Sequence, residues 1–204
     1  MGTKERKQKH KEDLRQRILD AARELFVSEG YRSASIRKIA EKIEYSPTAI
    51  YFYFKDKAEI LDALCSETFI GLDSELKRIQ RENLDALDSL RQCMRAYIHF
   101  GLAHPSHYLV TFIMTPEEYP VRDELCGKAH NGQIAFNNLR QSVRLAQKEG
   151  KLIDGDPEVI AQTIWLAEHG LVTGLISCIG FPFVEPEALI EQMIDVVIEG
   201  IRKK

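Results

Sequence analysis

The sequence has few of the residue patterns that catalysis and metal binding require. It has no GxSxG motif, no P-loop and no other glycine-rich phosphate cradle. The six histidines and four cysteines show no metal-ligand spacing, and the cysteines form no CxxC pair. His99, His104 and His107 invite a metal interpretation, but Pro105 breaks the helix between them and no acidic residue lies among them. We therefore expect no enzyme, no metal site and no cofactor.

Long apolar runs and strand patterns are also missing. The most apolar stretch, Gly170 to Val184, is uncharged, but it is too short to cross a bilayer and contains Pro182. The N-terminus is basic and polar and lacks the apolar core of a secretory signal. No segment alternates apolar and polar residues as a half-buried strand does. These absences predict an all-α, cytoplasmic protein with reduced thiols and no membrane contact.

The charge is distributed unevenly along the 204 residues, although the net charge is only −3. Residues 1–57 carry 14 Lys and Arg against 9 Asp and Glu, whereas residues 58–204 carry 14 against 22. Phosphate contacts dominate nucleic-acid affinity, so a basic segment before an acidic one fits a DNA-binding domain followed by a body that does not bind DNA.

The N-terminal segment predicts an arm and one amphipathic helix. Residues 1–11 are basic and nearly free of apolar side chains, which predicts a disordered arm. Such an arm either touches DNA phosphates or is simply solvated. Residues 12–29 place apolar side chains on one wide helical face, and Gly30 provides a suitable stop.

Two short helices separated by a tight turn come next. Ser35 suits the N-cap of a helix over residues 36–43, and Ser46 and Pro47 suit the start of another over residues 47–54. This spacing is typical of a helix-turn-helix, whose second helix enters the DNA major groove.

The end of this segment has its own local signals. Ile50 and Phe54 are four residues apart, so we expect them to be the buried pair of the second short helix. Asp56 and Glu59 have the spacing of a capping box, which places Lys57 at the N-terminus of the next helix. A helix N-terminus favours an anion such as a DNA phosphate.

Residues 12–60 resemble the TetR family of bacterial transcriptional regulators. The most specific part of the resemblance is the ordered aromatic run from Ile50 to Lys57 after Ser46. The other matching residues are Ala21, Ala22, Leu25, Phe26, Gly30, Tyr31, Ser35, Ile36, Arg37, Ile39 and Ala40. The resemblance departs at Glu44, where the family usually has glycine. A left-handed backbone there would cost Glu44 about 1 kcal/mol or more.

The resemblance implies a set of DNA contacts. Tyr51 and Lys57 resemble phosphate contacts, and Arg37 would reach the groove from the preceding helix. A solvated surface cation is the less favoured interpretation of Arg37. The full expected set is Ser35, Arg37, Ser46, Pro47, Thr48, Ala49, Tyr51, Phe52, Tyr53 and Lys57. Residues 46–54 contain no Arg, Lys, Asn, Gln, Asp or Glu, the side chains that read G or A bidentately. We therefore expect few direct contacts with base edges, and we expect DNA shape to supply the rest of the sequence preference.

The remainder predicts a larger helical domain over residues 58–204 and about nine helices in the whole chain. The expected helices begin near Lys57, Leu84, His107, Arg122, Asp156 and Glu185. The Trp165–Leu171 segment is similar to a family subgroup named for its Trp, His and Gly. The last two helices carry small residues and an unusually wide apolar surface, which is either monomer core or a homodimer interface. The dimer is favoured because a palindromic site needs two DNA-binding domains, here called heads.

The resemblance also implies a small-molecule pocket in the second domain. The candidate lining residues are Tyr97, Phe100, Tyr108, Phe112, Trp165 and His169. Together these features predict a homodimeric transcriptional repressor in the bacterial cytoplasm, associated with the nucleoid. It would bind a palindromic DNA operator and an unknown small-molecule effector. The alternative is an effector-independent DNA-organising factor, or one that works with a protein partner.

Overall fold

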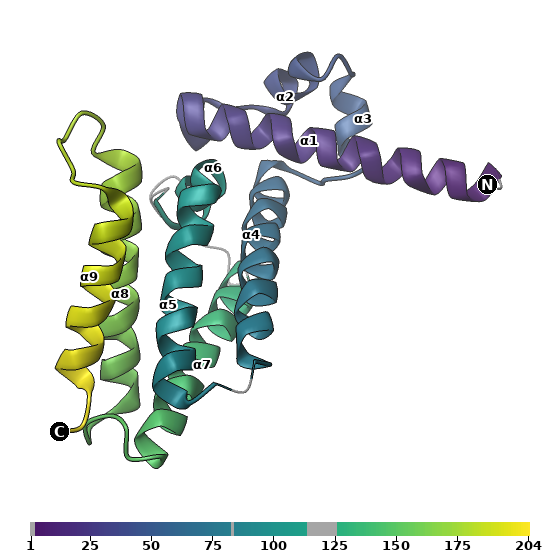
Figure 1. The fold of residues 1–204 in the computed structure, drawn as a ribbon. Helices are drawn as coiled ribbons and strands as arrows, with labels where there is room; N and C mark the ends of the chain where they lie inside the picture. The colour runs from purple at the N-terminus through teal and green to yellow at the C-terminus, as the bar shows by residue number, and fades with distance from the viewer. Residues whose placement is uncertain (1–2, 83, 114–125) are drawn as a thin grey trace. The chain divides into compact units, whose positions relative to one another are not determined.

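A computed structural model describes residues 3–82, 84–113 and 126–204, although the side chains of residues 3, 4, 7 and 126–131 are not described. These parts are helical, and they contain no strand (Figure 1). The predicted helix start at Arg122 lies outside the described residues. The helices are α1 (Thr3–Ser33), α2 (Ile36–Lys42), α3 (Pro47–Tyr51), α4 (Lys57–Gln80), α5 (Ala86–Ala103), α6 (Pro105–Tyr108), the π-helix η1 (Leu109–Ile113), α7 (Cys126–Lys148), α8 (Pro157–Ser177) and α9 (Pro186–Ile201).

The described residues divide into two compact units. The first holds those within 1–68 and 106–128, and the second holds those within 69–105 and 129–204. This division differs from the predicted boundary at residues 57 and 58. The core of the first unit includes Leu61 and Leu64 of α4 and Val110 of η1. The first unit therefore extends beyond the helix-turn-helix.

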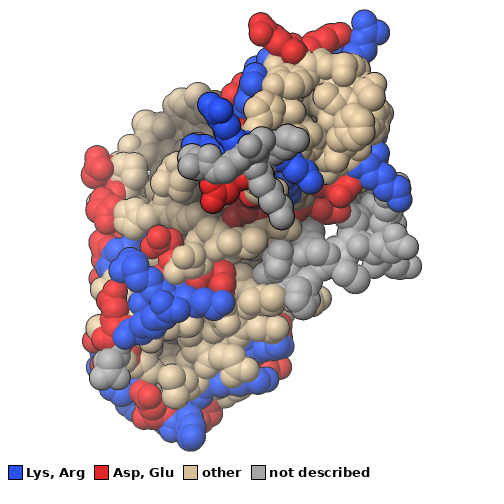
Figure 2. Space-filling model, turned by 90° about the vertical axis from the view of Figure 1, so that its right-hand side faces the viewer, with Lys and Arg blue, Asp and Glu red and all other residues tan. Residues whose placement is uncertain are grey.

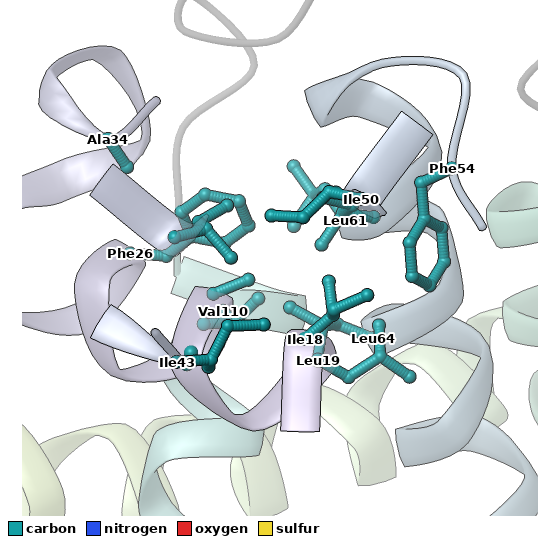
Figure 3. Close-up of a cluster of buried hydrophobic side chains, with 14 of the residues drawn as sticks. Ile18, Leu19, Phe26, Ala34, Ile43, Ile50, Phe54, Leu61, Leu64 and Val110 are labelled. Carbon is teal, nitrogen blue, oxygen red and sulfur yellow. The ribbon is translucent and has the colours of Figure 1, made fainter. Parts of the chain in front are cut away.

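The core of the first unit joins α1, α2, α3, the start of α4 and η1. In Figure 3, the side chains of Ile18, Phe26, Ile50, Leu61 and Val110 point into one cluster. Each of these side chains is at most 1% exposed. Because hydrophobic burial supplies most of the favourable free energy of folding, this cluster fixes the positions of α2 and α3 on α1.

The predicted disordered arm is wrong, because α1 begins at Thr3. Lys, Arg, Gln and Glu are good helix formers, and they extend a helix that the buried face further along has already nucleated. Gln8 Nε2 donates a hydrogen bond to Glu12 Oε1 at 2.7 Å, an i,i+4 pair that supports this extension. The helix is interrupted near its end by Gly30, at φ 80°.

The second unit contains a helix pair with an unusual composition. Figure 1 shows α8 and α9 side by side, joined at one end by residues 178–185, with α5 beside them. By length and composition alone α8 could cross a membrane, a property that core helices of soluble proteins share. Only 28% of its most apolar window is buried, which leaves much of its apolar surface uncovered.

Ion pairs hold α9 against α5 within this unit. Arg95 forms a bidentate pair with Glu191, with N–O distances of 2.6 and 2.5 Å. Arg91 pairs with Asp195 and also lies 3.5 Å from Glu199. The hydrogen bond to Arg95 lowers the pKa of Glu191, so this carboxylate is ionised at neutral pH.

Candidate functional site

The turn between α2 and α3 is built by local capping, as the sequence predicts. Ser35 Oγ accepts a hydrogen bond from the backbone N–H of Lys38 at 3.2 Å, and Ser46 Oγ accepts one from Ala49 at 3.3 Å. Pro47 occupies the first turn of α3, where its missing N–H costs nothing. The helix ends at Tyr51, earlier than predicted, because the Tyr53 N–H turns back to the Ile50 carbonyl.

Glu44 adopts the left-handed backbone that the sequence makes costly. Its φ is 61°, the one positive φ of a non-glycine residue in the described part of the chain. The Tyr45 N–H then donates to the Ala40 carbonyl at 2.9 Å, which closes the end of α2. The turn therefore keeps the geometry that suits glycine and carries the strain of a Glu side chain.

Glu44→Gly is expected to stabilise the protein. Relief of the left-handed strain exceeds the entropy that glycine loses, leaving a net gain of about 0.5–1 kcal/mol. The thermal midpoint should rise by about 1–4 °C. The matched control is Glu41→Gly within α2, which should lower the midpoint because glycine weakens a helix. A fall in the midpoint for Glu44→Gly would contradict the strain.

Most of the predicted DNA-contact residues are exposed, whereas the predicted buried pair lies in the core. Ile50 and Phe54 are 0% and 2% exposed, as predicted, whereas Tyr51 and Phe52 are 56% and 81% exposed. Tyr53 packs partly against the core, so Tyr51 carries the more accessible phenol. The remaining outward residues of this turn and helix are Ser35, Ser46, Pro47 and Thr48, with Ala49 half-buried.

Arg37 is the exposed cation beside this surface. Its side chain is 82% exposed, and Nε lies 2.9 Å from Glu41 Oε1. An exposed ion pair of this kind contributes little to stability, so Arg37 can exchange Glu41 for another partner at small cost. In the upper part of Figure 2, uncharged surface is bordered by side chains of both charge signs.

Lys57 has partners that the sequence does not predict. Its Nζ donates to the carbonyls of Tyr31 at 2.5 Å and Ala34 at 2.8 Å, and lies 4.1 Å from the centroid of the Tyr31 ring. The ammonium thus ties the start of α4 to the end of α1. These contacts differ from the predicted phosphate contact, and they come from tertiary packing that helix spacing cannot reveal.

Lys57→Met is expected to destabilise the first unit without changing the salt dependence of DNA binding. Loss of the charged hydrogen bonds should lower the free energy of unfolding by about 1.5–3 kcal/mol. A phosphate role would instead reduce the slope of log affinity against log salt by about 0.9 for each head. Lys55→Met is the control, since Lys55 is exposed at the same turn. An unchanged stability with a reduced slope would restore the phosphate role.

The six predicted effector-contacting residues fall in both units. Tyr108 and Phe112 belong to the first unit and pack together with ring centroids 4.7 Å apart. The other four belong to the second unit. Trp165 and His169 stack on α8, with centroids 5.1 Å apart and planes 23° apart. Burial lowers the pKa of His169, which favours the neutral imidazole in this stack.

Phe100 and Tyr97 have different surroundings on α5. Phe100 lines an open groove of about 630 Å³ between α4 and α5, whereas Tyr97 is buried. The groove also has a polar lining that the sequence did not indicate, formed by Ser74, Glu75, Arg78, Gln92 and Arg95. His99 and His104, which the sequence indicated only as metal candidates, line the same groove. Within the described part of the chain, no three His, Cys, Asp or Glu residues come close enough to hold a metal ion.

Glu168 is a further residue that the sequence did not single out. It is 3% exposed on α8 and is the one acidic side chain among the buried residues that the structure describes. Burial raises its pKa well above the ordinary value of 4.5. Burial, and to a smaller extent the charge of Glu168, raises the pKa of the Cys93 thiol on α5 to about 11.

Glu168→Gln should make the protein more stable, and increasingly so as the pH rises above 4.5. The folded protein holds the Glu168 proton more tightly than the unfolded chain does, so the wild type loses stability with rising pH between the two pKa values. Glutamine has no such proton to lose. Thermal midpoints of both proteins from pH 4 to 8 test this expectation, and a gap that shrinks with rising pH would contradict it.

Two known protein families match the chain, one in its N-terminal part and one in its C-terminal part. Residues 18–64 match the family described as "Bacterial regulatory proteins, tetR family", and residues 90–197 match "Tetracyclin repressor-like, C-terminal domain". The predicted Trp-His-Gly subgroup remains a prediction.

The curated relatives are transcriptional regulators and nucleoid factors. The regulator SrpR of Pseudomonas putida is 43% identical over 53 residues, which are 26% of this chain and 25% of SrpR. YvkB of Bacillus subtilis is 35% identical over 38% of this chain and 41% of its own length. The chain thus spans less than half of these two relatives. The nucleoid occlusion factor SlmA of Vibrio cholerae is 27% identical over 80% of this chain and 82% of SlmA.

Solved structures share the fold over nearly the whole chain. The fatty acid degradation regulator FadR from Bacillus halodurans has a TM-score of 0.78 at 20% identity, covering 93% of this chain and 97% of FadR. The ketosteroid regulator KstR2 of Mycobacterium tuberculosis has a TM-score of 0.74 at 17% identity, covering 93% and 95%. At these identities the likeness concerns the fold alone.

Proposed function

Because this chain belongs to the TetR family of DNA-binding transcriptional regulators, we propose that it is a homodimeric repressor whose hold on a palindromic operator is released by a small-molecule effector. The observation that carries the proposal is the capped α3. It buries Ile50 and turns Thr48, Tyr51 and Phe52 to the solvent. An exposed short helix held rigidly from behind is what major-groove binding requires.

Within this function the exposed side chains divide into two kinds of contact. Pro47 and Thr48 meet thymine methyl groups and base edges, and Arg37 supplies the one cationic base contact. Tyr51 binds a phosphate through its phenol, since it is more exposed than Tyr53. The rest of the sequence preference comes from DNA shape.

The homodimer forms through α8 and α9. Val159 and Leu166 of α8 and Val196 of α9 are each about 60% exposed, which is an unusual amount of uncovered apolar surface for a helix pair. The connection between the helices adds Ile179, which is 96% exposed, and further apolar side chains. A second copy of the same pair would cover this surface by a two-fold axis, as most homodimers do.

The effector acts through a difference in affinity for two arrangements of the dimer. Two heads engage a palindrome only when they are spaced by about one helical turn, 34–36 Å. An effector that binds more tightly to a dimer with another spacing lowers the affinity for the operator. At saturation, the largest possible reduction equals the ratio of the effector's affinities for the two arrangements of the dimer.

A DNA-binding assay tests the proposal without knowledge of the effector. The purified dimer should protect a palindromic site beside its own gene with at least about a thousandfold preference over unrelated DNA. Binding should weaken when a ligand found by thermal-shift screening is added. A dimer that binds no DNA at low salt would end the proposal.

A second candidate function rests on the similarity to proteins named nucleoid occlusion factor, which covers 80% of this chain. In that case the chain is an effector-independent DNA-organising factor with a protein partner. It would bind many dispersed sites, and no small molecule would alter its DNA affinity. Genome-wide binding by chromatin immunoprecipitation separates the two functions.

A further inference from the structure

Glu44 is the one charged residue between Lys42 and Lys55, the stretch that forms the turn and α3. Its side chain is exposed, and none of the residues that the structure describes forms an ion pair or a hydrogen bond with it. Its acidic neighbour Glu41 differs, because it pairs with Arg37 at 2.9 Å. A carboxylate on a DNA-binding surface repels phosphates, which supply most of the non-specific affinity for DNA. The Glu44 carboxylate is therefore available to a partner outside the chain, and the phosphate backbone is not that partner.

The residues on either side of Glu44 hold it in its strained conformation. Ile43 is buried in the core of the first unit, and its carbonyl accepts a hydrogen bond from Arg17 Nη2 at 3.1 Å. The Arg17 guanidinium also lies over the ring of Tyr45, with Cζ 5.3 Å from the ring centroid. Because both neighbours are fixed in this way, Glu44 keeps a φ of 61° and its side chain stays in the solvent. Strained residues persist where the surrounding structure over-determines them, and they cluster at functional sites.

Chain connectivity places Glu44 beside the end of α3 that the proposed function puts into the groove. Ser46 is the N-cap of α3, and two residues of chain span at most about 7 Å. The residues at the start of a recognition helix are those that contact base edges. Among the base edges of the major groove, a carboxylate accepts a hydrogen bond from the N4 amino group of cytosine, whereas guanine offers only acceptors there. The chemistry of Glu44 thus suits cytosine.

We propose that Glu44 is a specificity-determining residue of the head, and that its carboxylate accepts a hydrogen bond from the N4 amino group of a cytosine in each half-site. This inference rests on the proposed function, because it requires α3 to lie in a major groove. The same carboxylate lowers the affinity for unrelated DNA by repelling phosphates. Both effects raise the ratio of operator affinity to non-specific affinity, which is the quantity that matters in a genome. Glycine would relieve the strain but would make no such contact.

In vitro selection from randomised DNA tests the contact in the full-length protein, followed by titration of the selected sites at one salt concentration. The wild type should select cytosine at one symmetric position of each half-site, and replacing both cytosines should weaken its binding at least about tenfold. Glu44→Gly should show no preference at this position and should bind both sites equally. Glu44→Gln should select adenine there instead, because glutamine reads the N6 and N7 atoms of adenine.

Two controls separate base reading from folding and from general charge. Glu44→Gly is expected to be more stable than the wild type, so a base preference that disappears in this variant does not come from an unfolded head, and thermal unfolding verifies this. Asp20→Asn removes the same charge from the head. Asp20 lies on α1, where it pairs with Arg23 at 2.9 Å, and it is not part of the turn. This control should select the same bases as the wild type.

The outcomes separate this contact from the proposed function. A cytosine preference that is lost in Glu44→Gly and replaced by adenine in Glu44→Gln supports the contact. Identical selected sequences for the wild type and both Glu44 variants overturn it, even if Glu44→Gln and Asp20→Asn gain the same affinity for all DNA. In that case the wild type still selects an operator, so the proposed function stands. A wild type that selects no sequence contradicts the proposed function itself and the contact with it.

Discussion

Val196→Asp is expected to convert the protein to a monomer and to weaken operator binding by at least about 100-fold. Val196 is 62% exposed on α9, within the apolar surface that we assign to the dimer. An aspartate there would be buried without a partner in each copy, at a cost of several kcal/mol. A monomer would hold only one half-site, and most of the affinity of a palindromic operator depends on both.

The control for this variant is Leu145→Asp on α7, where Leu145 is 52% exposed. The two substitutions are chemically alike, but only the first lies on the proposed interface. Light scattering should show a monomer for Val196→Asp and a dimer for Leu145→Asp. If both variants remain dimers and bind the operator as the wild type does, the assignment of the interface to α8 and α9 is wrong.

Arg37→Ala is expected to remove most of the discrimination between operator and unrelated DNA. A bidentate arginine contact discriminates between bases by about 1–3 kcal/mol. Two heads double that amount, so operator affinity should fall by about 30-fold or more. Affinity for unrelated DNA should change only slightly, because it depends on phosphate contacts. The ratio of the two dissociation constants, measured at one salt concentration, is the relevant quantity.

Lys38→Ala is the matched control for Arg37. Lys38 is the next residue in the first turn of α2, and its ammonium pairs with Glu29 at 2.5 Å. Loss of a positive charge that makes no base contact should reduce the affinity for operator and for unrelated DNA by the same small factor. Equal losses of specificity in the two variants would mean that Arg37 acts only as a surface cation.

The local features of the head could be predicted because each depends on neighbouring residues. Ser35 and Ser46 cap their helices as expected, since capping needs only a hydroxyl and the next three residues. The strain at Glu44 was suggested only by the resemblance, because the family usually has glycine at this position, and the structure shows that Glu44 keeps the left-handed backbone. Periodicity likewise identified Ile50 and Phe54 as the buried pair.

The features that the sequence did not reveal all depend on contacts between distant residues. Lys57 binds carbonyls at Tyr31 and Ala34, more than 20 positions away, and a helix start gives no sign of such partners. Val110 joins the core of the first unit from a segment that reads as part of the second domain. The burial of Glu168 depends on the packing of α8 against α5, whereas an acidic residue in a helical pattern is normally exposed.

The most direct test of the account is a hydroxyl-radical footprint of the dimer on the DNA beside its gene, with the mass of the complex measured in parallel. Two chains on one site should protect two symmetric half-sites in adjacent major grooves, with centres about 10 base pairs apart. A footprint of one half-site by a single chain, or even protection without a preferred site, would contradict it.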